Sequence, residues 1–274
     1  MTALFLLILA TGIAPLVAGL LLLKPATQRA WPAAGSVLLC ALAFNLTFFW
    51  QELWLVIPKA LTPGLHPVLY HNNHDWTGNA PVAELLQGSG AIATLFSGLA
   101  FCLIMAMARR ISGTWRLFVF WMAFQGLYQS LTQLAIGTQL SGNDMGRALG
   151  YLGVGTAGHI LLLVLAVAAM ALAGGWLARR IPTRNSGYGL LLTALLSVIV
   201  VIPFRLPRNL IEVALIPLIV NMVGIGWLVL GMALVRRGAG HGPNEEQPTI
   251  MGPALALGGT LLLFQLVLRP GIAF

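Results

Sequence analysis

Residues 149–177 read LGYLGVGTAGHILLLVLAVAAMALAGGWL and contain no Asp, Glu, Lys or Arg. The hydrocarbon core of a bilayer is about 30 Å thick, and an α-helix crosses it with about 20 predominantly apolar residues. The segment is longer than that minimum, so it predicts a helix that spans a membrane.

Seven more segments of the chain meet the same criterion. They lie near residues 3–23, 33–57, 84–107, 115–139, 187–204, 209–235 and 252–268. Of the 274 residues, 58% are hydrophobic and only 8% are charged, whereas soluble domains carry about 25% charged residues. Such a surface needs hydrocarbon around it rather than water. We therefore expect an all-α, polytopic transmembrane helix bundle of about eight spans, with seven as the alternative because two segments are short.

The whole chain, residues 1–274, is predicted to form a single integral-membrane domain. The first apolar segment has neither a basic leader nor a clear small-residue cleavage site, which favours a retained helix over a signal peptide. The connections between segments are short except for a long one at 58–83 and a polar one at 238–249.

The positions of Lys and Arg predict the orientation. With eight spans, alternate connections hold 10 of the 15 basic residues, and the other connections hold five, namely Lys59, Arg147, Arg205, Arg208 and Arg269. Cytoplasmic loops carry the excess of basic residues. The sequence therefore predicts a multi-pass protein of the inner (plasma) membrane with both termini and the 58–83 loop outside, and with the 238–249 loop in the cytoplasm.

Several classes of partner and cofactor are disfavoured. The net charge is +8, but the basic residues form short pairs between apolar segments rather than a continuous face, so we expect no nucleic-acid partner. Phosphate-binding and nucleotide-binding glycine motifs are absent from the sequence. Cys40 and Cys102 lie within apolar segments and are interpreted as small hydrophobic residues. The expected partners are the lipid bilayer and either other membrane proteins or a second copy of the chain.

Ionisable and polar residues inside the spans are the first candidates for chemistry, because they are costly in hydrocarbon. Glu52 lies inside the second span and His159 is expected near the middle of the fifth. Each is predicted to be either a catalytic acid or base or one half of a structural pair. A stripe of Gln125, Gln129 and Gln133 recurs every four residues and so occupies one helix face. The stripe is predicted either to form hydrogen bonds between helices or to line a wet cavity.

The long 58–83 connection supplies a second group of candidates. His71, His74 and Asp75 have the ligand types that zinc or copper prefers, and the two histidines would face one ion if they shared a helical turn. A divalent metal is thus one hypothesis for a cofactor, and a solvated loop or a lid over the bundle is the other. Asp144 follows a Gly/Asn turn near a helix start, which predicts either a charge that complements the helix dipole or a catalytic carboxylate.

Two short patches resemble the intramembrane zinc proteases of the site-2 type. These place His-Glu-x-x-His on one span and an aspartate near the start of a later one, and here Glu52 and Asp144 occur in that order. However, Gln51 and Leu55 stand where the two histidines would be, and leucine cannot bind zinc. The chain is therefore not assigned to that family, and the resemblance implies at most a relative that has lost or rebuilt its metal site.

Three hypotheses for function follow, and the sequence leaves open whether the protein is an enzyme. The first is a polar, outward-facing intramembrane site that acts on a lipid-borne or periplasmic substrate. The second is a small transporter or channel, in which Pro203 and Pro217 mark candidate broken helices. The third is an accessory subunit of a membrane complex.

Overall fold

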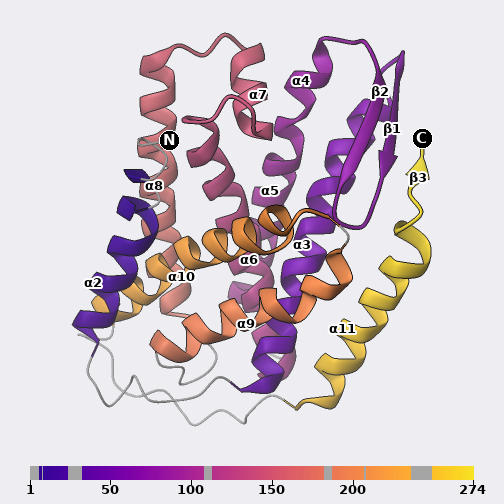
Figure 1. Ribbon diagram of the computed structural model, residues 1–274. Coiled ribbons are helices and arrows are strands. Elements are labelled where there is room, and N and C mark those ends of the chain that lie inside the picture. Colours follow the sequence, from indigo (N-terminus) through magenta and orange to yellow (C-terminus); the bar gives the residue numbers. More distant parts are fainter. Residues whose placement is uncertain are drawn as a thin grey trace.

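The computed structural model describes residues 6–7, 9–23, 33–107, 113–181, 187–206, 208–235 and 249–274, and it is an all-α helix bundle (Figure 1). The long helices are α3 (Ala34–Ala60), α5 (Gly88–Met107), α6 (Gly113–Gly137), α8 (Thr156–Ala178), α9 (Gly187–Arg205) and α10 (Ile216–Val235). Shorter helices are α2 (Ala14–Leu22), α4 (Val82–Leu86), α7 (Asp144–Tyr151) and α11 (Met251–Leu263). Single π-helical turns precede α2 and α10 and follow α11, at Leu9–Ile13, Ile211–Leu215 and Phe264–Leu268.

The bundle has the surface of a membrane protein. Within the described residues, six helical segments are long and apolar enough to cross a membrane: 34–60, 82–107, 156–178, 187–205, 211–235 and 251–268. Large apolar side chains on their outer faces are exposed, for example Leu103 on α5 and Leu172 on α8, which is 75% exposed. Contiguous exposed apolar surface of this extent is unfavourable in water but not in lipid.

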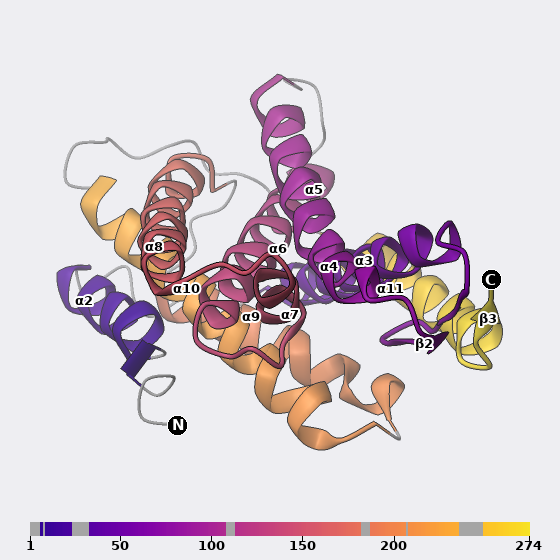
Figure 2. The same cartoon turned by 90° about the horizontal axis from the view of Figure 1, so that it is seen from above.

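Helix α6 is also long, but it is not one of these six segments. It lies in the middle of the bundle, where it packs against α3, α5, α8 and α10 (Figures 1 and 2). Its buried residues include Gln125 and Gln129 of the glutamine stripe as well as Trp121 and Tyr128. Because neighbouring helices cover these polar groups, they do not face lipid. The sequence predicted a span near 115–139, and α6 is that helix. Its mean hydropathy is lower than that of the six segments above because its central position allows buried polar side chains.

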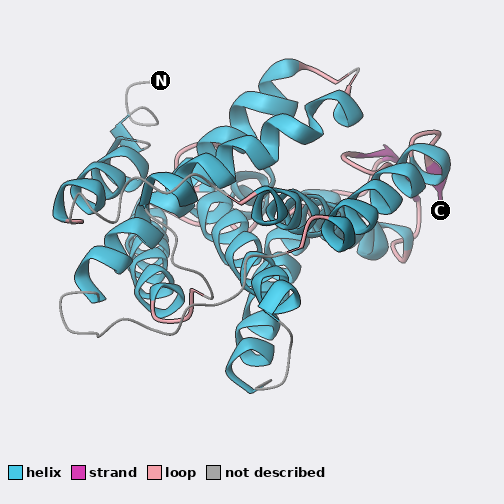
Figure 3. Cartoon of the chain, turned by 90° about the horizontal axis from the view of Figure 1, so that it is seen from below, coloured by secondary structure: helices cyan, strands magenta, loops and turns pink. Residues whose placement is uncertain are grey.

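Three short strands lie together at one corner of the bundle, beside the C terminus (Figure 3). β1 (Leu65–Leu69) pairs antiparallel with both β2 (His74–Gly78) and β3 (Ile272–Ala273), so the strand order is β2-β1-β3. The predicted 58–83 loop is thus largely a β-hairpin packed on α3. We call the end of the bundle that carries this hairpin, α4 and α7 the hairpin end (Figure 1).

The apolar segment 149–177 is two helices rather than one. The chain leaves α7 after Tyr151 and begins α8 at Thr156, and Gly153 between them has φ +64°, a left-handed conformation that glycine adopts at little cost. His159 consequently lies in the first turn of α8 at the hairpin end, and its predicted position near the middle of the membrane is wrong. Asn143 caps α7 by accepting a hydrogen bond from the Gly146 amide, so Asp144 does begin a helix.

Five basic residues were assigned to the connections predicted to lie outside. They lie in or beside the segments that meet at the hairpin end: Lys59, Arg147, Arg205, Arg208 and Arg269. Much of the majority set, including the pairs at 109–110 and 236–237, lies outside the described residues, as does the 238–249 loop except for its last residue. The orientation relative to the cell therefore stays a prediction.

Candidate functional site

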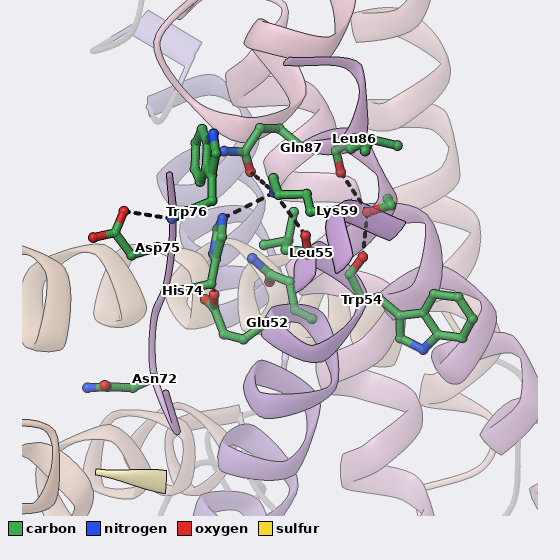
Figure 4. Close-up of polar contacts among 12 residues, drawn as sticks. Glu52, Trp54, Leu55, Lys59, Asn72, His74, Asp75, Trp76, Leu86 and Gln87 are labelled. Atoms are coloured by element: carbon green, nitrogen blue, oxygen red, sulfur yellow. Dashed lines mark hydrogen bonds and ion pairs between the residues drawn. The ribbon is translucent and has the colours of Figure 1, made fainter. Parts of the chain in front are cut away.

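The last two turns of α3 form the base of a buried polar cluster at the hairpin end. Glu52 and Lys59 are seven residues apart, which places both on the same helix face. Between them, Pro58 lacks the amide that would bond to the carbonyl of Trp54. The hydroxyl of Ser89, at the start of α5, donates to that carbonyl instead (2.6 Å; Figure 4). The sequence therefore continues α3 through a proline and ties it to α5 beside the cluster.

A hydrogen-bonded chain of three side chains crosses from α3 to the hairpin. His74 Nδ1–H donates to Glu52 Oε2 at 2.7 Å, and Lys59 Nζ lies 3.4 Å from His74 Nε2 (Figure 4). Lys59 also donates to the carbonyl of Leu55 (2.9 Å) and to Gln87 Oε1 (3.5 Å). With Nδ1–H held by the carboxylate, Nε2 carries the lone pair that accepts from the ammonium. Glu52 is 4% exposed and Lys59 is fully buried, so the network is shielded from bulk water.

Trp76 covers this chain on the hairpin side. Its ring stacks on His74 with centroids 5.6 Å apart and an interplanar angle of 10°, and Lys59 Nζ lies 4.7 Å from the Trp76 centroid. The Arg147 guanidinium lies 5.1 Å from the same ring. Two cations near one indole ring contribute favourable cation–π energy, and the stacked ring covers the imidazole.

Helices α4 and α7 cover the cluster at the hairpin end of the bundle. Arg147 on α7 makes a two-pronged ion pair with Glu84 on α4, at 2.6 and 2.7 Å, and this pair raises the pKa of Arg147. Asp144 lies one turn earlier on α7. Burial raises the pKa of the Asp144 carboxyl and the charge of Glu52 raises it further, while His74, Lys59 and Arg147 oppose the shift. The structure thus brings Glu52 and Asp144 within electrostatic range of each other, and the charges of Lys59 and Arg147 act on the Asp144 carboxyl as well.

His71 and Asp75 do not join His74. Residues 70–73 form the turn of the hairpin, so the helical turn that would have aligned the two histidines is not formed. His71 donates from Nε2 to the Phe204 carbonyl on α9 (3.1 Å), and Asp75 is exposed and accepts from the Trp76 amide. In the described part of the chain, no three His, Cys, Asp or Glu side chains are close enough together to hold a metal ion. The predicted convergence of His71, His74 and Asp75 is therefore not found.

His159 is also separate from the cluster. Its Nδ1 lies 2.8 Å from the carbonyl of Thr138, just beyond the end of α6, and donates to it. The charges that act on Asp144 come from Glu52, His74, Lys59 and Arg147 and do not include His159. Of the three predicted catalytic residues, the structure thus brings together Glu52 and Asp144 but not His159.

Lys59, Trp76, Glu84 and Arg147 were not predicted as members of a site. Lys59 was assigned to a connection, because an apolar span was expected to end at Pro58. The available signal was the seven-residue spacing of Glu52 and Lys59, which puts a carboxylate and an ammonium on one helix face. Nothing in the sequence alone paired Glu84 with Arg147, which are 63 residues apart.

The glutamine stripe connects helices within the bundle. Gln133 donates to Gln51 on α3, Gln125 donates to Asn221 on α10 (2.9 Å), and Gln129 donates to Gln125 (3.0 Å). The prediction that the stripe faces other helices is confirmed. On α3 and α6, three buried side-chain oxygens have no hydrogen-bond partner among the described residues: Thr47 Oγ1, Gln129 Oε1 and Thr132 Oγ1.

Comparison with known protein families, curated proteins and solved structures finds no match to this chain. The resemblance to site-2 type proteases therefore rests on residue order and on the proximity of Glu52 and Asp144. At the first histidine position, Gln51 is bonded to Gln133 and not to a member of the cluster. At the second, Leu55 offers only its carbonyl, to Lys59.

Proposed function

We propose that the cluster at the hairpin end is an acid–base site acting on a substrate that reaches it from the bilayer or from the water at the outer membrane face. The observation that carries this proposal is the buried chain Glu52–His74–Lys59. A carboxylate that holds one imidazole nitrogen fixes the tautomer and leaves the other nitrogen to exchange a proton. A purely structural ion pair needs no imidazole between its charges.

The chemistry can be followed atom by atom. A substrate hydroxyl, amine or bound water replaces Lys59 as the partner of His74 Nε2 and gives its proton to that nitrogen. Glu52 then stabilises the imidazolium through Nδ1–H. The Lys59 ammonium faces the negative charge that develops on the substrate. The deprotonated oxygen or nitrogen forms a bond to the electrophilic atom of the substrate while the bond from that atom to the leaving group breaks. The Asp144 carboxyl, whose pKa is raised by burial and by Glu52, is the proposed donor of a proton to the leaving atom.

The depth of the site supports a lipid-borne or interfacial substrate. Trp50 and Trp54 lie on α3 on either side of Glu52 in sequence, and both are exposed on the outside of the bundle. Their rings pack edge to face, 5.9 Å apart. Exposed tryptophans gather at the boundary between hydrocarbon and headgroups. With these tryptophans at that boundary, the neighbouring acid–base cluster would be at the depth where an amphiphilic substrate presents its polar part, which supports the proposal.

The test compares membranes that carry equal amounts of folded native protein, Glu52→Gln and Glu246→Gln. The last variant makes the same chemical change in the polar 238–249 connection and serves as the matched control. Mass spectrometry of lipids and released peptides should show a product formed by native protein and by Glu246→Gln. Loss of an acid–base group typically costs about 10²–10⁴-fold in rate, so Glu52→Gln should nearly abolish that product. Identical profiles for native protein and Glu52→Gln would refute the proposal.

A proton or solute pathway is the second candidate. It is favoured by the hydrogen-bonded glutamine stripe and by three buried oxygens on α3 and α6 that have no partner among the described residues. Water bound to such groups would extend the polar chain. Reconstituted vesicles with a pH-sensitive dye should then show proton flux that Gln129→Leu reduces, and vesicles without flux would count against it. The accessory-subunit hypothesis stays a prediction from the sequence.

A further inference from the structure

A second polar region lies on the other side of the hairpin from the acid–base cluster. It is a cavity of about 250 Å³, and its polar lining includes His71, Asn72, Asn73, Asp75, Arg208 and Arg269. These residues come from the hairpin turn and β2, from the connection between α9 and α10, and from the C-terminal segment after α11. Figure 4 shows Asn72 lying apart from Glu52, His74 and Lys59.

Positive charge dominates the surroundings of this cavity. Burial lowers the pKa of the His71 imidazole, and the charges of Arg205, Arg208 and Arg269 lower it further. Arg208 is paired with Glu212 at 2.7 Å and also donates to the Asn72 carbonyl. Arg269 bonds only to the neutral amide of Gln265 (3.2 Å). Among the described residues, two of the three arginines therefore have no carboxylate partner.

Arg205 is the most unusual of the three. It is 2% exposed, and none of its three guanidinium nitrogens has a hydrogen-bond partner in the described part of the chain. Its guanidinium lies over the rings of Phe48 (4.3 Å) and Phe44 (5.2 Å) on α3. Its backbone carbonyl accepts from Asn72, which lines the cavity. The charge of Glu52 acts on Arg205, and Arg205 does not line the cavity itself, so it adds positive charge beside the cavity rather than a donor inside it.

One residue of the lining carries a buried polar atom without a partner in the described part of the chain. His71 is 92% buried, since its exposed fraction is 8%, and its Nδ1 has no hydrogen-bond partner among the described residues. Its Nε2 is held by the Phe204 carbonyl, which fixes the ring. A protonated Nδ1 would be a further donor, and a bound anion is what would favour that proton.

We propose that this cavity binds a phosphate group. A phosphate offers several acceptor oxygens, which suit guanidinium, amide and imidazole donors placed around one space. The volume is below the 300–1,000 Å³ typical of pockets for larger ligands, so it suits a headgroup or a small phosphate ester. Asp75 also lines the cavity but is exposed and bonded to the Trp76 amide. The cavity is surrounded by helix ends and the hairpin. Two sources of the phosphate group are therefore tested below, a phospholipid headgroup and a soluble phosphate ester.

The experiment uses the full-length protein in nanodiscs. One arm compares phosphatidylglycerol nanodiscs with phosphatidylcholine nanodiscs and measures retained lipid by native mass spectrometry. The other arm titrates inorganic phosphate and glycerol 3-phosphate into the phosphatidylcholine sample by calorimetry. Arg269→Gln is the test variant, because Arg269 is exposed and its replacement leaves no buried charge unpaired. Arg179→Gln removes the same charge at the exposed end of α8 and is the control.

Native protein and Arg179→Gln should bind one of these probes, and Arg269→Gln should bind it about 10- to 100-fold more weakly, as expected for loss of one hydrogen bond to a charged group. The arm that shows binding identifies the source of the phosphate. Absence of binding in both arms, or equal weakening by the two variants, would overturn the proposal. Neither result bears on the acid–base site, which uses neither Arg269 nor this cavity.

Discussion

Replacing Lys59 by Met should destabilise the protein strongly, because it removes the cation at the end of the buried chain. Lys59 is fully buried and donates to Gln87 and to the Leu55 carbonyl, besides contacting His74. Loss of one member of a buried charged network costs about 3–5 kcal/mol, since the remaining charge is left uncompensated. The Leu55 carbonyl keeps its helical partner, so the cost falls on Glu52 and on the buried Gln87 amide oxygen.

The double variant Lys59→Met/Glu52→Gln separates this explanation from a packing defect. With both charges gone, the free energy of unfolding should recover by about 1–3 kcal/mol relative to the sum of the single variants, the coupling expected for residues in one network. Reversible unfolding in mixed micelles with increasing SDS measures all four proteins. Lys24→Met, at the only other lysine of the chain, is the control and should change stability by about 0.5 kcal/mol or less. Additivity of the two single variants within about 0.5 kcal/mol would refute the electrostatic argument.

Two further predictions concern helix packing and pH. Gly126→Ala should destabilise the protein by about 1–3 kcal/mol, because a Cβ there would lie 2.5 Å from the backbone of Gly98 on α5. Gly175→Ala is the control and should not destabilise it, since a Cβ at that position meets nothing within 4 Å. Equal effects of the two variants in an unfolding assay would contradict the close approach of α5 and α6. Because burial lowers the pKa of His71 below 6.5, the unfolded chain takes up a proton first as pH falls, so the free energy of unfolding should decrease below about pH 6.5. His71→Asn should flatten that dependence, and an unchanged slope between pH 7.5 and 5.5 would show that other groups cause it.

The spans were predictable because a bilayer imposes a length and a polarity on each helix. Segments expected at 33–57 and 187–204 appear as Ala34–Ala60 and Gly187–Arg205. The span expected at 149–177 appears as Thr156–Ala178, so only its predicted start was wrong. A cluster of glycines divides the apolar run there, and hydropathy does not register backbone conformation. The hairpin was missed although Leu65, Pro67 and Leu69 alternate in burial with their neighbours. That period of two is too short, within one five-residue strand, to stand out from a polar loop.

The candidate site was only half predictable, for a physical reason. An ionisable residue inside an apolar span, such as Glu52, can be recognised in the sequence because it is costly in hydrocarbon. Its partners cannot be recognised in this way, because they come from connections whose geometry depends on tertiary packing. His71 and His74 were equivalent in the sequence, and only the strand register of the hairpin, with Leu69 opposite His74, assigns one to the turn and the other to a strand.

The hairpin therefore sets both polar regions through a single register. His74 begins β2 and contacts Glu52, whereas His71 lies in the preceding turn and contacts the Phe204 carbonyl. In a β-hairpin, a slip of one residue turns every side chain to the opposite face. Such a slip would take His74 from Glu52 and would also move Trp76 off Lys59, leaving a buried carboxylate and a buried ammonium without the groups between them. The burial of these two charges on α3 thus specifies the register of a strand pair that local sequence specifies only weakly.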